Sequence, residues 1–243
     1  IVITGDASDK IEETCTCLAD YFRKVKFNEE ISRYVGLDLL RDRIQRTMTL
    51  SQRPYQQSLL DKYNAGHKRP RSTPINPVSD LRTKGGGTLP DVYEQSGEIG
   101  YLADRSMPEL KFASSQLRSA AADPTAEHEK AIQHVHRYLA SDSRPPGITF
   151  RRGSTTEVLL FGMSDGSAIK GHDSVSQLAY CFFLNLHSGT VCSRSVKASA
   201  IGTAPSDVEL KAIVLAFKKG IFLRGLLFEI GYPQHQPTVI YTD

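Results

Sequence analysis

Three carboxylates in the last third of the chain occupy positions where they could act together. Asp165 ends a strand-like apolar run, Glu209 lies near the start of a long predicted helix, and Asp243 follows the final apolar run. If the strands that carry the two aspartates lie parallel and adjacent, both side chains emerge at one edge of the sheet. A crossover helix on that sheet can bring Glu209 to the same place. The spacing therefore predicts one cluster of three carboxylates.

Carboxylates without nearby Cys or His favour hard cations, so the cluster predicts a site for Mg²⁺ or Mn²⁺. Two such ions about 4 Å apart would activate water and stabilise the leaving oxygen in phosphodiester cleavage. Each carboxylate also has a local explanation. Ser164–Gly166 is a turn signal, Ser206–Glu209 reads as a helix capping box, and Asp243 can be an ordinary residue at a strand end.

The elements that must position these carboxylates alternate in type along the last third of the chain. A short strand is predicted over Ile148–Arg152, and longer strands and one helix follow it. The longer strands cover Val158–Asp165, Leu178–Leu186, Thr190–Lys197 and Thr238–Thr242, with a helix over about Ser206–Ile230 before the last strand. A helix in that place allows a parallel crossover onto a sheet that is otherwise built from hairpins.

The first two thirds of the chain read as a hairpin followed by helices. The hairpin covers Tyr34–Arg41 and Thr47–Leu50, and a helix over Asp9–Lys24 precedes it. Further helices are predicted over about Ser51–Tyr63, Asp91–Asp104 and Pro108–Ala122, and over a segment that follows Asp123 as its N-cap. The histidines of that last helix lack the spacing of metal ligands, so contacts with solvent or backbone are expected for His128, His134 and His136.

Composition limits the class of protein. The chain has 243 residues, of which 40% are apolar and 23% charged, and these values are typical of globular proteins and exclude wholesale disorder. No apolar run is long enough to span a membrane. Four cysteines are too few for a disulfide scaffold, which favours a reducing intracellular compartment. Predicted strands at both ends, beginning at Ile1, favour a piece of a longer polypeptide.

The net charge of +3 permits binding to nucleic acid without requiring it. The basic run His67–Arg71 includes Lys68 and Arg69, and it is either a solvated loop or a contact for phosphate. If the carboxylate cluster cleaves a nucleic acid, Arg194 and Lys197 on the third predicted strand are expected to contact phosphate.

The order of short motifs over nearly the whole chain resembles the end of a copia-type (Pseudoviridae) retrotransposon polyprotein. The resemblance runs from just after the polymerase active site into the ribonuclease H domain. The matching stretches are Tyr34–Leu39, Thr49–Gln52, Tyr55–Tyr63, Ser72–Pro74, Gly100–Glu109, Asp123–His128, His136–Leu139, Ser164–Asp165, Tyr180–Leu184, Asp207–Glu209, Leu223–Leu227 and Tyr241–Asp243.

This resemblance implies an α/β (α+β) chain in three parts. Residues 1–50 would be the end of the reverse-transcriptase palm, 51–145 a helical thumb and connection, and 146–243 a ribonuclease H-like mixed sheet with a crossover helix, incomplete at its C-terminus. It implies that Asp165, Glu209 and Asp243 are the catalytic, metal-binding carboxylates. The implied partners are an RNA–DNA hybrid, gripped by the thumb and connection, and the palm and fingers in the rest of the polyprotein.

The chain also departs from the family pattern. The paired polymerase aspartates are not in this chain, and there is no Trp where family members often carry two, near Ser167 and Arg194. The segment before the catalytic helix reads Ala204–Glu209 in place of the usual Ser-Ser-Thr-Glu-Ala-Glu. Two hypotheses follow: a metal-dependent endonuclease acting on the RNA of a hybrid, or a host-adapted, inactive scaffold or nucleic-acid-binding module.

Overall fold

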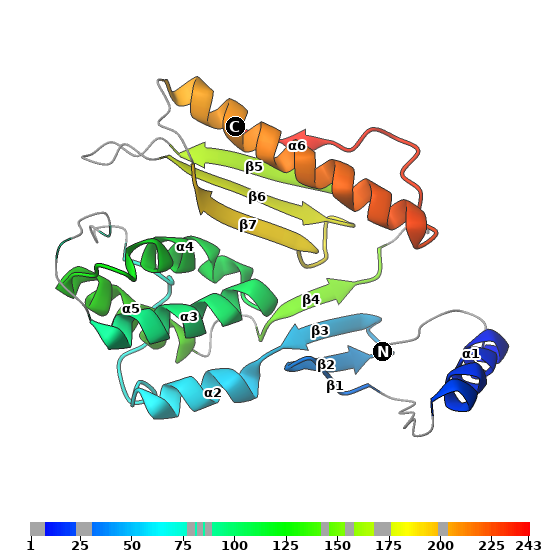
Figure 1. Cartoon of the computed structure of the whole chain (residues 1–243), viewed down its shortest axis with the longest axis horizontal. Helices are drawn as coiled ribbons and strands as arrows, with labels where there is room; N and C mark the ends of the chain where they lie inside the picture. Colours follow the sequence, from blue (N-terminus) through cyan, green and yellow to red (C-terminus); the bar gives the residue numbers. More distant parts are fainter. Residues whose placement is uncertain are drawn as a thin grey trace.

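The computed structural model describes residues 8–22, 31–76, 81, 85, 89–141, 146–153, 158–167, 176–198 and 204–243. Two four-stranded sheets, a group of helices and one long helix make up these parts (Figure 1). The mixture of helices and sheets confirms the predicted α+β class. The strand predicted at the beginning of the chain lies outside the described residues.

The first sheet, sheet A, is antiparallel in the order β1-β2-β3-β4. Its strands are Arg33–Tyr34, Leu37–Asp42, Thr47–Ser51 and Ile148–Arg151, and helix α1 (Ser8–Tyr21) precedes them. The strand predicted over residues 34–41 is interrupted because Val35 and Gly36 both have positive φ, which makes a tight turn between β1 and β2. Strand β4 pairs with β3, so this piece of the last third completes the sheet of the first 51 residues.

The helical group contains α2 (Arg53–Lys62), α3 (Pro90–Arg105), the short 3₁₀ helix η1 (Pro108–Leu110), α4 (Lys111–Ala120) and α5 (Ala126–Leu139). Two predicted helix starts were wrong. Ser51 completes β3, and Gln52 occupies the N-cap of α2. Thr125 caps α5 in place of Asp123, because its hydroxyl and backbone close a capping box with His128.

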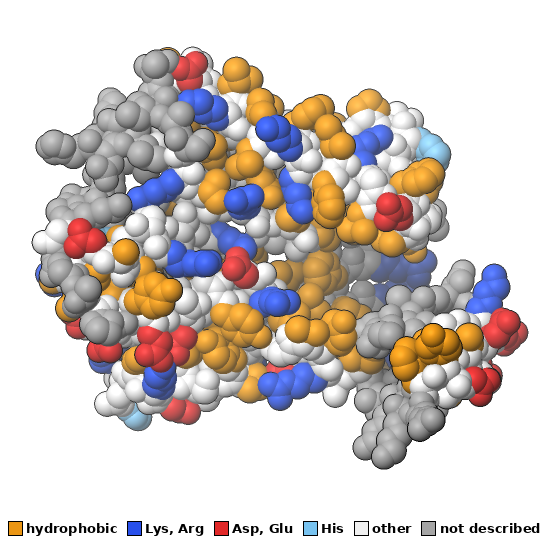
Figure 2. Space-filling view, in the orientation of Figure 1, with side chains coloured by type: hydrophobic (Ala, Val, Ile, Leu, Met, Phe, Trp, Pro, Cys, Tyr) orange, Lys and Arg blue, Asp and Glu red, His pale blue; other side chains and the backbone are white. Residues whose placement is uncertain are grey.

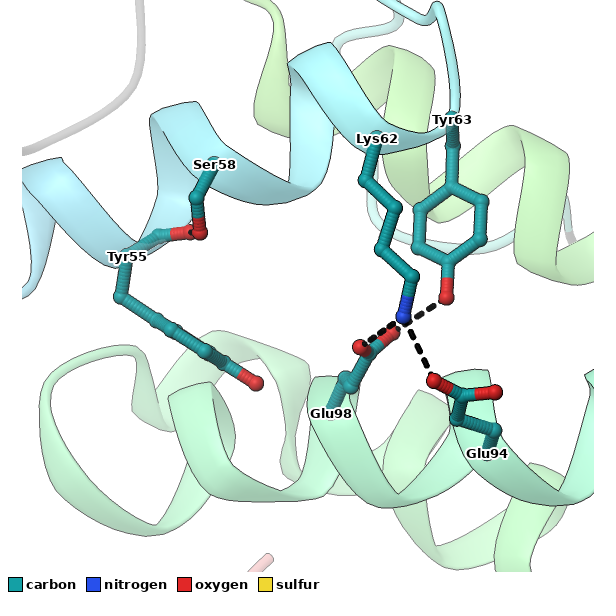
Figure 3. A network of polar contacts seen from close by, with 6 residues as sticks. All are labelled: Tyr55, Ser58, Lys62, Tyr63, Glu94 and Glu98. Atoms are coloured by element: carbon teal, nitrogen blue, oxygen red, sulfur yellow. Dashed lines mark hydrogen bonds and ion pairs between the residues drawn. The ribbon is translucent and has the colours of Figure 1, made fainter.

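Lys62 and Tyr63, at the end of α2, contact two glutamates of α3 (Figure 3), and Tyr63 also contacts α5. Lys62 Nζ donates to Glu94 at 2.6 Å and to Glu98 at 2.8 Å, and the Tyr63 hydroxyl donates to Glu98 at 2.7 Å. The Tyr63 ring stacks on His136 of α5, with ring centroids 4.6 Å apart. Ion pairs this exposed contribute about 1 kcal/mol or less, so the buried stack is the stronger link.

The second sheet, sheet B, has the order β7-β6-β5-β8. Its strands are β5 (Phe161–Ser167), β6 (Gln177–Phe183), β7 (Cys192–Lys197) and β8 (Ile240–Tyr241). The first three are antiparallel, and β8 joins β5 in parallel after helix α6 (Pro205–Glu229) has crossed the sheet. The predicted crossover is therefore confirmed. No helix among the described residues is both long and apolar enough to span a bilayer.

Helix α6 covers one face of sheet B and packs closely on it (Figure 1). The helix turns the buried small residues Ala212, Ala216 and Gly220 toward the sheet. On the covered face, strand β5 carries only Gly162, Ser164 and Gly166, which alternate with exposed residues. Small residues on both sides let the helix approach the strand, and this close approach determines where the first turn of α6 lies.

Candidate active site

The parallel pairing of β5 with β8 places two of the predicted carboxylates on or just beyond adjacent strands. Met163 lies opposite Tyr241, and Asp165 follows two residues later in β5. Asp243 is two residues beyond Tyr241, past the end of β8 and its paired register. Both aspartates are exposed, and Asp165 lies on the face of the sheet that α6 leaves open.

Glu209 lies near the start of α6, directly after the first turn. A Cβ atom built on Gly166 would lie 2.6 Å from the Val208 carbonyl oxygen and 3.1 Å from the Glu209 backbone nitrogen. The helix therefore touches β5 at the residue directly after Asp165. The half-buried Glu209 side chain starts from this contact, and the positive end of the helix dipole favours negative charge nearby.

Two of the local explanations for these residues do not hold in the structure. Ser164, Asp165 and Gly166 lie inside β5, so they form no turn. The N-cap of α6 is Ala204, which makes no side-chain cap hydrogen bond, and Ser206 is already helical. The capping-box interpretation of Glu209 was therefore wrong, and no capping role accounts for a carboxylate at this position.

The three residues suit a hard divalent cation in their chemistry, because they offer only carboxylate oxygens. In the parts of the chain that the structure describes, no three His, Cys, Asp or Glu side chains stand together as metal ligands. Like charges repel, so three carboxylates gain nothing by converging without a cation between them. The backbone of α6 contacts β5 next to Asp165, but the three side chains are not gathered into a metal site.

The predicted basic residues fall in two places. Lys197 of β7 lies on the same open face as Asp165. It pairs with Gln177 of β6, which in turn pairs with Ser167 of β5, two residues after Asp165. Arg194 is exposed on the same edge strand, opposite Tyr180. Lys68 and Arg69 instead follow α2 in the helical group.

The loop that carries Lys68 and Arg69 is held against α5. The Arg137 side chain donates to the Arg69 carbonyl at 2.7 Å, and the Lys68 backbone donates to Ala65. The structure therefore does not bring this basic pair to sheet B. Two of the α5 histidines contact backbone as predicted, since His128 meets the Leu81 carbonyl and His134 the Thr73 carbonyl. The prediction was wrong for His136, which is buried and stacks on Tyr63, and whose Nε2 has no hydrogen-bond partner among the described residues.

A cleft of about 720 Å³ separates η1 and α4 from the open face of sheet B. Asp165 lines it, together with Glu109, Lys111, Phe112, Met163, Cys181, Phe183, Ser193, Arg194 and Ser195 among others. At one end the helix is attached to the sheet. Gln116 donates to the Gln177 side-chain oxygen at 3.0 Å, and Gln177 donates to Ser115 and Ser195. Sequence reasoning missed this cleft because its walls lie far apart in the chain.

The Cys181 thiol and the Tyr180 hydroxyl, which also line the cleft, are neutral near pH 7. Burial raises the pKa of the Cys181 thiol, and burial is also the main cause that raises the pKa of Tyr180 to about 12. A thiol with a raised pKa is a poor nucleophile. The carboxylates are therefore the groups on this face that can bind a cation or carry catalytic charge.

Comparison with curated proteins finds relatives along the whole chain. The chain is 29% identical, over 246 aligned residues, to "Retrovirus-related Pol polyprotein from transposon RE1" of Arabidopsis thaliana, and 28% identical to the corresponding protein from transposon RE2. It is 24% identical over 231 residues to the polyprotein from transposon TNT 1-94 of Nicotiana tabacum. The chain spans 16% of the length of each of these polyproteins.

A shorter relative has a different description. Over 128 residues, 52% of this chain, the sequence is 30% identical to "Secreted RxLR effector protein 161" of Plasmopara viticola, and the match covers 87% of that protein. No family model matches the chain, and no solved structure matches it.

Proposed function

We propose that this chain, which is similar along its length to retrotransposon Pol polyproteins, is the part of a reverse transcriptase that cleaves the RNA strand of an RNA–DNA hybrid. Asp165, Glu209 and Asp243 are its catalytic residues in this proposal. One observation supports it most: β8, which Asp243 follows, pairs in parallel with β5, and α6 contacts β5 at Gly166, between the positions of Asp165 and Glu209.

Asp165, Glu209 and Asp243 would hold Mg²⁺ or Mn²⁺, which supplies an activated water and charge neutralisation for phosphodiester hydrolysis. The fold of the chain determines the positions of these carboxylates. Asp165 comes from β5, Asp243 follows the neighbouring strand β8 by two residues, and Glu209 comes from a helix end that contacts Gly166. Carboxylates on such elements keep their spacing, which is the main requirement for orienting a reacting phosphate.

The hybrid would be bound through its backbone. Lys197 and Arg194 on β7 supply cations at the edge of the sheet, and Lys68 and Arg69 supply further positive charge on the helical group. Recognition of this kind depends on the A-like shape of the duplex and on the 2′-hydroxyl, and it reads few bases. The palm and fingers elsewhere in the polyprotein are the proposed protein partners, in a particle in the cytoplasm or in the nucleus.

Cleavage of a hybrid with a labelled RNA strand tests this proposal, using a Pol polyprotein product that contains this chain. With Mg²⁺ present, Asp165→Asn is expected to abolish cleavage while hybrid binding persists. Glu229→Gln, which removes a carboxylate at the opposite end of α6, is the matched control and is expected to cleave normally. Unchanged cleavage by Asp165→Asn would overturn the assignment.

A second candidate function is a binding module that has lost catalysis. The secreted effector of Plasmopara viticola, which matches half of this chain, supports it, because that protein is named as an effector and not as a polyprotein. In the same assay this candidate predicts hybrid binding by the unsubstituted protein with no cleavage at any Mg²⁺ or Mn²⁺ concentration.

A further inference from the structure

The open face of sheet B carries an aromatic surface beside the carboxylates. We call it the aromatic platform, and it consists of Phe161, Met163, Phe183 and Tyr241. The Phe161 ring stacks on Phe183 with centroids 5.4 Å apart, and Tyr241 meets Phe161 edge-on. Tyr241 is 56% exposed and Met163 46% exposed. The uncovered face of an antiparallel sheet is normally polar, so apolar side chains held in water here indicate a binding surface.

Phe112 of α4 faces this region from the other wall of the cleft. Its side chain is 42% exposed although it lies in a helix whose other apolar residues are buried. The space of about 720 Å³ lies in the range of roughly 300 to 1,000 Å³ that small-molecule ligands occupy. A cleft of this size accepts one or two planar rings, and it does not accept a double helix.

The polar groups of the cleft suggest the rest of the occupant. Ser193 and Ser195 present hydroxyl groups from β7, where Arg194 lines the cleft and Lys197 lies on the open face. Cations on one side and exposed rings in the middle are the combination that binds single-stranded nucleic acid, in which bases stack and phosphates meet positive charge. Glu109 and Asp165 also line this cleft, so phosphates are expected to lie toward Arg194 on β7 and away from β5.

We propose that the aromatic platform and Phe112 bind unpaired bases of a single-stranded nucleic acid, which crosses the platform and enters the cleft between α4 and sheet B beside Met163 and Phe183. This proposal rests on the proposed function in one respect, because both take nucleic acid as the ligand. It needs neither bound metal nor cleavage, so it can fail while the nuclease assignment stands, and the reverse also holds.

Fluorescence anisotropy of a labelled oligothymidylate of about ten nucleotides tests the proposal in the presence of EDTA. The unsubstituted chain is expected to bind it. Phe112→Ala and Tyr241→Leu each remove a ring, and each is expected to weaken binding about 5- to 150-fold, the loss that corresponds to one base–aromatic stack. Phe217→Ala is the matched control, because Phe217 is 58% exposed on α6, on the opposite side of the sheet.

Three different results would contradict the binding proposal. The proposal is overturned if the unsubstituted chain does not bind the oligonucleotide, if the Phe112→Ala/Tyr241→Leu double variant binds it normally, or if Phe217→Ala weakens binding as much as the two test variants. In each case the platform would be a contact surface for protein. Circular dichroism of every variant separates loss of binding from loss of fold, and Asp165→Asn assayed on a hybrid reports separately on the nuclease.

Discussion

The carbonyl oxygen of Val208 lies 2.6 Å from the point where a side chain on Gly166 would begin. Real Cβ atoms do not approach a backbone oxygen so closely, so α6 can rest on β5 here only because residue 166 is a glycine. This contact fixes the first turn of α6, and with it Glu209, beside the strand that carries Asp165. Figure 2 shows the side of α6 that faces away from sheet B, where apolar side chains alternate with Lys or Arg residues on the surface.

Gly166→Ala is therefore expected to push the first turn of α6 away from β5. Forcing a methyl group into this contact should cost about 1–3 kcal/mol of unfolding free energy, measured by urea denaturation. The same change should reduce hybrid cleavage more than stability alone explains, because it moves Glu209.

Gly225→Ala in the same helix is the matched control. No atom lies within 4 Å of the Cβ position at Gly225, so the new methyl group meets open space. An alanine within a helix is favoured over glycine by about 0.5–1 kcal/mol, and the variant should be slightly more stable than the unsubstituted chain. Equal destabilisation by both substitutions would contradict the contact at Gly166.

The attachment of α4 to sheet B depends on Gln116 and Gln177. Both side chains are buried, and Gln116 Nε2 donates to the Gln177 side-chain oxygen at 3.0 Å. Gln116→Ala leaves that oxygen without its donor, at an expected cost of about 1–3 kcal/mol. In the Gln116→Ala variant, backbone hydrogen exchange should rise in α4 and β7. Gln133→Ala, on the exposed face of α5, is the control and should change the free energy of unfolding by less than about 0.5 kcal/mol. Unchanged exchange in β7 would show that α4 is attached by other contacts.

Stability should also fall in mild acid because of His136. Burial lowers the pKa of this histidine to about 4 from an ordinary value of 6.5, and Glu98 and Lys68 are the charged groups that face it. Between these two values the unfolded chain binds a proton that the folded chain does not, so stability is full above about pH 6.5 and declines as the pH falls toward 4. The loss between about pH 7.5 and pH 5 should be roughly 2 kcal/mol in urea denaturation.

His136→Phe keeps a ring against Tyr63 and removes the titrating group, so the decline should become shallower by that amount. His187→Gln alters an exposed histidine and should leave the pH dependence unchanged. The account of the acid sensitivity fails if His136→Phe and the unsubstituted chain lose stability equally.

Local patterns predicted the elements of sheet B well. Apolar runs gave β5, β6 and β7 to within a few residues, and the long helix was placed to within one residue at each end. The strands before Asp165 and Asp243 could be predicted as parallel neighbours, because a helix between two strands implies a parallel crossover. Gly166 was predicted to lie in a turn. A glycine within a strand instead indicates that another part of the backbone approaches the strand closely.

Long-range pairings could not be predicted in the same way. Nothing in Ile148–Arg151 indicates that it joins β3, because an edge strand of four residues can complete either sheet. The cleft beside Asp165 depends on Gln116 and Gln177, which are 61 residues apart and have no shared periodicity. Helix starts at residues 51 and 123 were misplaced because Ser and Asp are favoured both at caps and in the turns that precede them.

The central claim is that Asp165, Glu209 and Asp243 form one cation site, and Mn²⁺ binding measured by isothermal titration calorimetry tests it most directly. The unsubstituted chain should bind Mn²⁺, and Asp165→Asn, Glu209→Gln and Asp243→Asn should each weaken binding at least about tenfold, while Glu229→Gln should not. Equal Mn²⁺ affinity in all four variants and the unsubstituted chain would contradict the claim.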